Sequence, residues 1–329
     1  MEGLTLGIVG LGHWGPNLAR NLDDLADARL TWLCDREEAR LERFAARFPQ
    51  ARRTSRFENL LEDESLAAIA IATPVVTHFE LAREALVAGK HVFVEKPLAL
   101  SATLSEQLLA LAEERGLVLM PGHLLLYHPG VAKLKELVAT GELGRLLYVY
   151  GNRQNLGQIR RDENALWSLG AHDLSVILHL VEEEPVEAWA RGESFLNPGI
   201  EDVVFCYLRF PSGKVAHMHL SWLDPHKMRR MTVVGDRKMA VFDDMELERK
   251  VTVYDKGPEQ SAETYGEWLT RTGDISIPKV ANDEPLRLEC EHFLSLLRGD
   301  GDRFAAARDG LAVVRALEQL QASLEREHV

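Results

Sequence analysis

Hydrophobic residues in the first 120 positions come in short continuous runs, separated by stretches in which apolar and polar residues alternate with helical periodicity. The continuous runs predict buried strands at 4–9, 29–34, 67–72, 91–94 and 118–120. The amphipathic stretches predict helices at 16–25, 37–47, 78–88 and 104–115. Strands that are apolar throughout, each followed by a helix, indicate a parallel sheet covered on both faces. We therefore predict a doubly wound α/β domain of the Rossmann type over residues 1–122.

The pattern changes after residue 122. Helices are predicted at 131–139 and 172–181, on either side of a polar, arginine-rich segment at 152–164. The strands that follow alternate apolar with polar side chains, which is typical of an antiparallel sheet with one covered face. They are predicted at 186–195, 203–210, 214–222, 230–234, 239–242 and 250–254, followed by a long loop at 257–284 and helices at 286–297 and 304–325. We expect residues 123–329 to form an α+β domain with a large, mostly antiparallel sheet, which binds substrate and forms oligomers.

Composition narrows the function classes. A chain of 329 residues is long enough for two domains, and its net charge of −13 argues against a general nucleic-acid binder. The three cysteines are far apart in sequence, which favours neither a zinc site nor a disulfide framework. No apolar run reaches the roughly 18 residues of a membrane span. These features predict a cytoplasmic protein whose partner is a small molecule, not nucleic acid or a membrane.

A glycine-rich motif follows the first predicted strand. Residues 10–15 read Gly-Leu-Gly-His-Trp-Gly and open the first predicted helix. Gly10 permits a tight turn, Gly12 lets the backbone approach a pyrophosphate, and Gly15 lets the helix pack closely on the sheet. Amides at the helix N-terminus favour an anion. The motif predicts a dinucleotide site; a purely structural turn is the alternative.

Asp35 ends the second predicted strand, 20 residues after Gly15. A carboxylate there can accept both hydroxyls of an adenosine ribose and repels a 2′-phosphate, which favours NAD. Arg36 beside it could receive a 2′-phosphate, so NADP stays an alternative. Asp35 could also cap the following helix, which is compatible with binding the cofactor.

A third motif, Glu95-Lys96-Pro97, follows the strand predicted at 91–94. Together with Ala-Thr-Pro at 72–74, His78 and the run at 89–98, it resembles the glucose–fructose oxidoreductase/inositol dehydrogenase (Gfo/Idh/MocA) family. The resemblance extends over nearly the whole chain and implies an NAD(P)-dependent dehydrogenase, in which Lys96 lies beside the nicotinamide and the reacting hydroxyl, often before a cis proline. The predicted cofactor-binding residues are Gly10, Gly12, His13, Trp14, Gly15, Asp35, Arg36, Thr73, Pro74, His78, Glu95, Lys96 and Pro97.

The family usually places an aspartate, and a histidine four residues later, on the first helix of the substrate region. Here His172 matches the histidine, whereas Ser168 stands where the aspartate is expected. A serine can only form hydrogen bonds and cannot tune its neighbours by charge. Asp173 could compensate, although it points about a quarter-turn away on a helix. The resemblance implies that His172 accepts the proton of a secondary alcohol and that Lys96 stabilises the developing negative charge.

The segments at 10–21 and 150–167 are similar to a subgroup that oxidises C3 of UDP-linked sugars, such as UDP-N-acetylglucosamine or its uronate. Arginines in an acidic chain are candidates to clamp a diphosphate, with surface ion pairs as the alternative. Asparagines there could bind sugar hydroxyls or cap turns. The predicted substrate-binding residues are Lys96, Arg153, Asn155, Arg160, Arg161, Asn164, Trp167 and His172.

Three alternatives stay open: a dehydrogenase of a free polyol such as inositol, a glycosidase that uses NAD for transient oxidation, and a cofactor-dependent regulatory protein. His217 and His219 share one face of a strand, but no third ligand is evident, so no metal is predicted. The second sheet is expected to carry Val203, Phe205, Tyr207 and Leu220 on an open face. Burial of that face against another subunit predicts a homodimer or homotetramer.

Overall fold

The computed structural model describes residues 3–157, 159–161, 163–260 and 268–327, and divides into two compact units. Unit 1 comprises Met1–Leu124 and Glu284–Val314, and unit 2 comprises Leu125–Asp283 and Arg315–Val329. The first boundary lies two residues from the predicted one. Residues 284–314 differ from the expectation, since they pack with unit 1 although they follow the second sheet in sequence.

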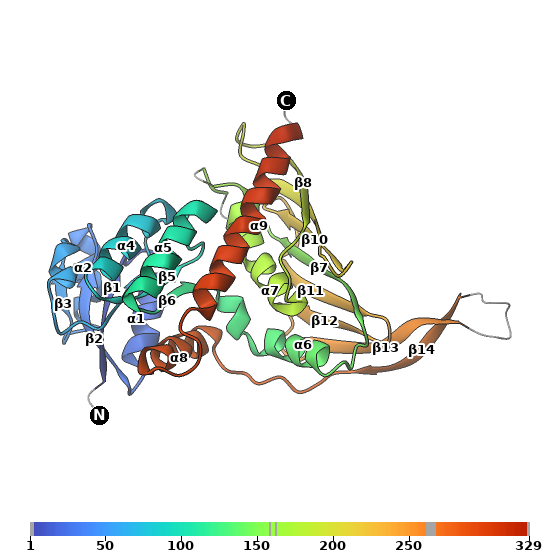
Figure 1. Cartoon of the computed structure of the whole chain (residues 1–329), viewed down its shortest axis with the longest axis horizontal. Helices are drawn as coiled ribbons and strands as arrows, with labels where there is room; N and C mark the ends of the chain where they lie inside the picture. Colours follow the sequence, from blue (N-terminus) through green and yellow to red (C-terminus); the bar gives the residue numbers. More distant parts are fainter. Residues whose placement is uncertain (1–2, 158, 162, 261–267, 328–329) are drawn as a thin grey trace. The chain divides into compact units, whose positions relative to one another are not determined.

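Unit 1 is built on a six-stranded sheet with the order β3-β2-β1-β4-β5-β6, and every strand pair in it is parallel. This confirms the predicted doubly wound domain (Figure 1). The order reverses between β1 and β4, where ligands of such sheets bind at the carboxyl ends of the strands. The strands are β1 (Leu4–Val9), β2 (Ala28–Cys34), β3 (Arg52–Thr54), β4 (Ala68–Ile71), β5 (His91–Glu95) and β6 (Leu119–Gly122).

Helices pack on this sheet as two groups. α4 lies against α5, and α1 lies against α8 from the far end of the chain. α5 has a serine N-cap, Ser101, and ends at Gly116 in the left-handed conformation, as its sequence favours. The elements are α1 (Gly15–Asp23), α2 (Glu38–Ala45), α3 (Glu58–Leu61), η1 (Val75–Thr77), α4 (His78–Val87), α5 (Ala102–Arg115) and α8 (Pro285–Arg298).

Unit 2 is built on an eight-stranded sheet with the order β14-β13-β12-β11-β7-β10-β9-β8. Only β7 and β10 pair in parallel among its described strands, so the expected antiparallel sheet is confirmed. The strands are β7 (Leu146–Gln154), β8 (Glu187–Glu193), β9 (Val203–Arg209), β10 (Val215–Ser221), β11 (Met228–Gly235), β12 (Met239–Asp243), β13 (Val251–Gln260) and β14 (Trp268–Ser276). The helices are α6 (Pro129–Ala139), a π-helix η3 (Leu166–Gly170) and α7 (Ala171–Val181); η2 (Leu124–Tyr127) and α9 (Ala305–Glu327) belong to both units.

Three sequence predictions were wrong or incomplete. The loop expected at 257–284 instead contains the end of β13 and all of β14, which form a long hairpin (Figure 1). No residue of β14 is buried, so it lacks the alternation of apolar and polar residues by which a half-buried strand is recognised. β3 is too short to give a pattern. β7, a central strand, was missed because its second half is the polar segment Gly-Asn-Arg-Gln.

The two faces of the second sheet differ in burial. η3 contacts β10 on the covered face, where a Cβ at Gly170 would meet the side chains of Leu220 and, farther off, Leu317 of α9. Leu220 is fully buried there, so its expected place on the open face was wrong. Val203, Phe205 and Tyr207 do alternate with buried neighbours, and Phe205 is 49% exposed. The open face therefore carries aromatic side chains in the single chain.

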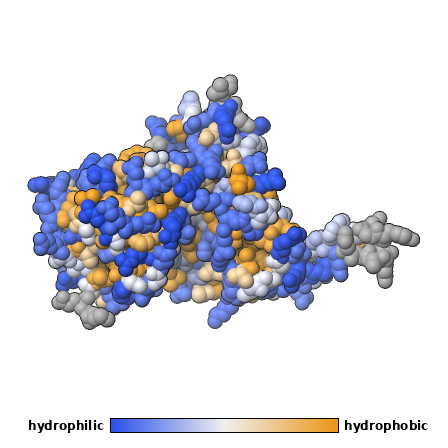
Figure 2. Space-filling view, viewed as in Figure 1, coloured by the Kyte–Doolittle hydropathy of each residue, from blue (hydrophilic) through white to orange (hydrophobic). Residues whose placement is uncertain are grey.

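Hydrophobic and hydrophilic residues are interspersed over the face drawn in Figure 2. None of the helices in the described ranges combines the length and hydropathy that crossing a membrane requires.

Candidate functional site

The glycine turn after β1 is dictated by the fold at two positions. Gly10 has a φ of +92°, and a Cβ there would lie 2.7 Å from the carbonyl oxygen of Ala72. A Cβ on Gly15 would lie 1.8 Å from the carbonyl oxygen of Gly10. By contrast, a Cβ on Gly12 would meet only Arg40 Nη1, at 3.5 Å. The space beside Gly12 is thus open on the side that the motif assigns to a pyrophosphate.

The N-terminus of α1 has the features of an anion site. Pro16 occupies the first turn, that turn holds no acidic residue, and Trp14 at the N-cap makes no side-chain capping bond. Pro16 has no amide proton, and the Asn17 amide donates to the Trp14 carbonyl oxygen at 2.9 Å, so the attraction of this end for an anion comes from the helix dipole. A dinucleotide pyrophosphate fits this end of α1.

Asp35 connects the glycine turn to the loop after β2. Its Oδ2 accepts a hydrogen bond from the Leu11 amide at 2.6 Å, and its Oδ1 accepts one from the Glu37 amide at 2.9 Å. The N-cap of α2 is Glu37 and no side chain caps that helix, so the alternative of Asp35 as a helix cap was wrong. Its bonds instead shape the loop before α2, and they leave further lone pairs for ribose hydroxyls. Arg36 is exposed, whereas Arg40 Nη1 lies 3.6 Å from Asp35 Oδ2. Arg40 was missed from the sequence, where only its spacing from Glu37 could have drawn attention to it.

The peptide bond between Lys96 and Pro97 is cis, as the resemblance implied. His78 supports this turn from inside the unit. Its Nδ1 lies 2.9 Å from the carbonyl oxygen of Pro97, and its Nε2 lies 2.9 Å from that of Thr73. Burial lowers the pKa of His78. His78 therefore joins the loops after β4 and β5, and both its ring nitrogens are already engaged there.

Two further titratable groups lie at the carboxyl ends of β5 and β6. Glu95 is buried, and burial raises its pKa to about 8 against the opposing effects of Lys96 and a hydrogen bond from the Trp14 side chain. His123 is buried as well, and burial together with Lys96 lowers its pKa to about 4. Neither ring nitrogen of His123 has a hydrogen-bond partner in the described part of the chain. No local pattern in the sequence indicates how deeply either group is buried.

The predicted substrate residues lie in unit 2, apart from Lys96. Arg153 on β7 is buried and donates to Asp173 Oδ1 from Nε at 2.8 Å and from Nη2 at 2.7 Å. Burial raises the pKa of Asp173, and Arg153 opposes that rise. Asp173 thus ties α7 to β7. A phosphate role for Arg153 would require Asp173 to share its guanidinium.

His172 and Ser168 are placed by a change in helix type. Ser168 is buried within the π-helix η3, and His172 is partly exposed in the first turn of α7. Asn164 precedes them, and its Oδ1 accepts from the Trp167 amide at 3.1 Å. Its Nδ2 donates to Glu201 at 2.6 Å. Asn164 therefore has the turn-capping contacts that were the alternative to sugar binding, and π-helical turns are frequent at functional sites.

Of the remaining predicted residues, three lie between β7 and η3, and Trp167 lies within η3. Arg160 and Arg161 are exposed, and Arg160 Nη1 lies 3.0 Å from a carboxylate oxygen of Glu163. Asn155 and Trp167 are partly exposed. Unit 2 thus leaves two arginines accessible and turns the third inward.

His217 and His219 lie on the open face of the second sheet, where they contact the rings of Tyr150 and Phe205. Within the described residues, no three His, Cys, Asp or Glu side chains are arranged to hold a metal ion.

Comparison with known proteins gives the same division of the chain. Residues 4–123 match the model of an oxidoreductase family with an NAD-binding Rossmann fold, and residues 131–241 match the GFO/IDH/MocA C-terminal domain. The UDP-N-acetylglucosamine 3-dehydrogenase of Acidithiobacillus ferrooxidans is 27% identical over 98% of this chain and 97% of its own.

A structure of that dehydrogenase superimposes with a TM-score of 0.85 over 99% of both chains, at 26% identity. GenD2 from gentamicin A biosynthesis, solved in complex with NAD, has a TM-score of 0.82 and 25% identity over 99% of this chain and 95% of its own. The scyllo-inositol 2-dehydrogenase (NAD(+)) of Bacillus subtilis is 27% identical over 67% of each chain.

Proposed function

The chain belongs to the Gfo/Idh/MocA family of NAD-dependent oxidoreductases, and on this basis we propose that it oxidises C3 of a UDP-linked hexose such as UDP-N-acetylglucosamine or its uronate. The observation that carries the proposal is the extent of the match. The UDP-N-acetylglucosamine enzyme aligns over 98% of the chain, whereas the inositol enzyme aligns over 67%. The full-length match therefore includes most of unit 2, where the substrate residues lie.

In this proposal the bound NAD accepts a hydride, and the protein supplies binding, orientation and proton handling. Gly12 and the N-terminus of α1 hold the pyrophosphate, and Asp35 holds the adenosine ribose. His172 accepts the hydroxyl proton of the sugar, since a neutral imidazole offers one ring nitrogen as a proton acceptor. Lys96 donates a hydrogen bond to the same oxygen and stabilises its negative charge.

Arg160 and Arg161 are the accessible candidates for the diphosphate, because guanidinium groups bind phosphate through two parallel hydrogen bonds. Both are exposed in a chain of net charge −13. Arg153, with its buried partner Asp173, supports the sheet and α7. We also propose that the aromatic open face of the second sheet is buried in a homodimer or homotetramer.

The first experiment is a thermal shift titration of the NADH-loaded protein. A ligand that binds the folded state raises its stability in proportion to ln(1 + [L]/Kd), even where turnover is unfavourable. We expect saturable stabilisation by UDP-N-acetylglucosamine or its uronate and none by myo-inositol. A clear shift with NADH, but none with either UDP-sugar, would contradict the proposed substrate and direct the search to free polyols and glycosides.

The diphosphate contact is tested with Arg160→Ala and Arg161→Ala. Each is expected to weaken UDP-sugar binding by about tenfold, the value of a charge-assisted hydrogen bond. Arg249→Ala is a matched control, because Arg249 is also exposed in unit 2 and pairs three residues away, with Glu246. UDP-sugar affinity that is equal in all three variants and the wild type would rule out these arginines as the clamp.

A further inference from the structure

Two buried carboxyl groups in unit 1 are not explained by the packing around them. Glu289 on α8 is 1% exposed, and its Oε1 has no hydrogen-bond partner among the described residues. Glu95 at the end of β5 is also buried. Ionisable side chains are almost never this deeply buried without a partner. The pair therefore needs a specific account.

The geometry places the two carboxyls opposite one another. Phe93 and Glu95 lie two residues apart on β5 and share one face of the sheet. Phe93 packs edge-on against Phe293 of α8, with ring centroids 5.7 Å apart, and Glu289 lies one helical turn before Phe293. A Cβ on Gly122 would meet Phe93 Cζ at 3.1 Å and Glu95 Oε2 at 3.3 Å, so the Glu95 carboxyl stays on this face.

The charges around the pair come from four elements. Lys96 is the cation that acts on Glu95, and the Trp14 indole of the glycine turn donates a hydrogen bond to it. On α8, the Cys290 thiol is buried beside both carboxyls, and the charges of Glu284 and Arg20 of α1 also act on that thiol. At the end of β6, His123 lies in the field of Lys96.

The charges do not balance if both carboxyls ionise. Glu95 is the neighbour whose negative charge acts on Glu289, and burial and that charge both raise the pKa of Glu289 well above its usual value. Two neighbouring buried carboxyls therefore retain at least one proton over the pH range in which Glu95 ionises.

We propose that Glu289 is a positioning residue that stays protonated beneath Glu95, and that ionisation of Glu95 above it sets the relative affinity of the protein for NAD⁺ and NADH. Glu289 acts through Glu95, which belongs to the same sheet edge as the cofactor motifs. The proposal depends on the cofactor alone, so it can hold or fail whichever sugar is oxidised.

The direction of the effect follows from the sheet order and the charge of the cofactor. Asp35 at the end of β2 takes the adenosine ribose, and the turn after β1 takes the pyrophosphate. The other half of the dinucleotide therefore extends toward the ends of β4, β5 and β6. The nicotinamide of NAD⁺ carries a positive charge that NADH lacks. Ionised Glu95 adds a negative charge that favours NAD⁺, whereas protonated Glu95 adds none and so favours NADH by comparison.

The test measures Kd for NAD⁺ and for NADH by titration calorimetry on the full chain between pH 6.5 and 9.5. The ratio Kd(NADH)/Kd(NAD⁺) is expected to rise about tenfold over this range, the size of one unit charge acting through a partly polar interior. Binding of NAD⁺ near pH 7.5 should release to the buffer more protons than NADH binding does, which buffers of different ionisation enthalpy reveal. A flat ratio with no difference in released protons would overturn the proposal without any variant.

Three substitutions test whether Glu289 influences Glu95 or only fills space in the core. Glu95→Gln should remove the rise in the ratio. Glu289→Gln keeps a neutral polar side chain and should keep the rise, whereas Glu289→Leu makes the surroundings of Glu95 less polar and should move the rise to higher pH, because desolvation opposes ionisation. Glu291→Gln is the control, since Glu291 lies on the same helix but is exposed and pairs with Arg287.

If Glu289→Leu folds and its ratio Kd(NADH)/Kd(NAD⁺) depends on pH as in the wild type, Glu289 only packs in the core and the proposal is wrong. Infrared difference spectroscopy gives a second readout if that variant does not fold. At pH 7 the wild-type spectrum should contain a carboxylic acid carbonyl band to which Glu289 contributes. That contribution should be absent from the spectrum of Glu289→Gln. Spectra that match at pH 7 would show Glu289 ionised and refute the proposal.

Discussion

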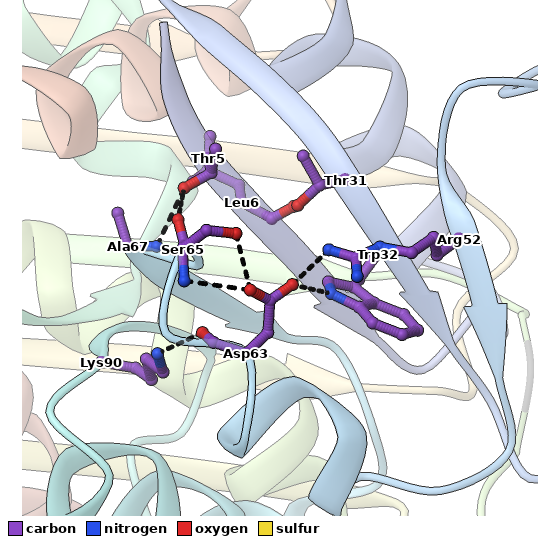
Figure 3. Close-up of polar contacts among 9 residues, drawn as sticks. All are labelled: Thr5, Leu6, Thr31, Trp32, Arg52, Asp63, Ser65, Ala67 and Lys90. Carbon is purple, nitrogen blue, oxygen red and sulfur yellow. Dashed lines mark hydrogen bonds and ion pairs between the residues drawn. The ribbon is translucent and has the colours of Figure 1, made fainter.

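Asp63 and Glu95 are acidic residues at opposite ends of the strands of one parallel sheet. Asp63 lies where the strands begin, here called the amino edge, and Glu95 lies where they end, here called the carboxyl edge. Their surroundings shift their pKa values in opposite directions. Asp63 lies at the amino edge, before β4, where it accepts hydrogen bonds from Trp32 Nε1 at 2.7 Å and from Ser65 Oγ at 2.6 Å (Figure 3). Arg52 adds an ion pair. Hydrogen bonds from Ser65 and Trp32 lower the pKa of Asp63 to about 2, whereas burial raises that of Glu95 to about 8.

The difference distinguishes a carboxylate that stabilises the fold from titratable groups at the ligand-binding end of the same sheet. At the amino edge the protein supplies every partner that the carboxylate needs, and even the Asp63 carbonyl accepts a bond from Lys90 Nζ at 2.6 Å (Figure 3). At the carboxyl edge Glu95 and His123 are both buried, and neither ring nitrogen of His123 has a hydrogen-bond partner among the described residues. Strongly perturbed titratable groups gather at functional sites, and open α/β sheets bind ligands at the carboxyl edge. The first edge stabilises the fold, and the second is prepared for a ligand.

The largest expected effect is at the carboxyl edge. Lys96→Ala should lower kcat by about a thousandfold, because it removes a charged donor from the developing oxyanion. The melting temperature should change little, since the loss is in transition-state binding. Steady-state kinetics and calorimetry on the same preparation measure both. Full activity in the variant would show that this edge does not carry the chemistry.

Asp35→Ala should weaken NAD binding by about ten- to a hundredfold, since a carboxylate that accepts ribose hydroxyls contributes charge-assisted hydrogen bonds. Binding of NADP should weaken less, because the repulsion of its 2′-phosphate is removed as well. Fluorescence titration with NADH and NADPH measures the two affinities. Equal losses for both cofactors would mean that Asp35 acts only by holding the Leu11 and Glu37 amides.

Asp63→Ala should lower the free energy of unfolding by about 2–3 kcal/mol, because Trp32 and Ser65 lose their common acceptor. Urea denaturation measures the loss, and NAD affinity of the folded fraction should be unchanged. Glu58→Ala, at an exposed position on α3 nearby, is the control and should have little effect. A loss of NAD affinity in Asp63→Ala would remove the distinction between the two edges.

The pH dependence should have opposite signs at the two edges. Asp63 has a folded pKa of about 2, below the ordinary value of 3.8, so its contribution to stability is complete above pH 4 and is lost as pH falls toward 2. The stability difference between wild type and Asp63→Asn should shrink by about 2 kcal/mol over that interval.

Glu95 has a folded pKa of about 8, above the ordinary value of 4.5, so its contribution to stability is complete below pH 4.5 and is lost as pH rises toward 8. Wild type should therefore lose stability relative to Glu95→Gln between pH 4.5 and 8. Equilibrium unfolding at a series of pH values measures both differences. The pKa shifts would be contradicted if the two stability differences, wild type against Asp63→Asn and wild type against Glu95→Gln, changed with pH in the same direction.

Much of unit 1 was predictable because its signals are local. The buried strands, the turn at Gly10 and Gly15, and Asp35 at a strand end each depend on neighbours within a few residues. The cis bond before Pro97 came from resemblance. In unit 2 the polar end of β7 concealed a central strand, and the exposed β14 gave no pattern. Arg153 shows the same limit, since nothing near it in sequence indicates that Asp173 is its partner.

The sequence by itself determined the order of strands and helices, the dinucleotide motif, and the identity of Lys96 and His172 as candidates for the chemistry. Only the tertiary structure decided which charges are buried and which have partners. Glu289 lies near Glu95 because α8, which follows the second sheet in sequence, packs with the first unit. Burial and electrostatic partnership depend on contacts between distant segments, and no local pattern encodes them.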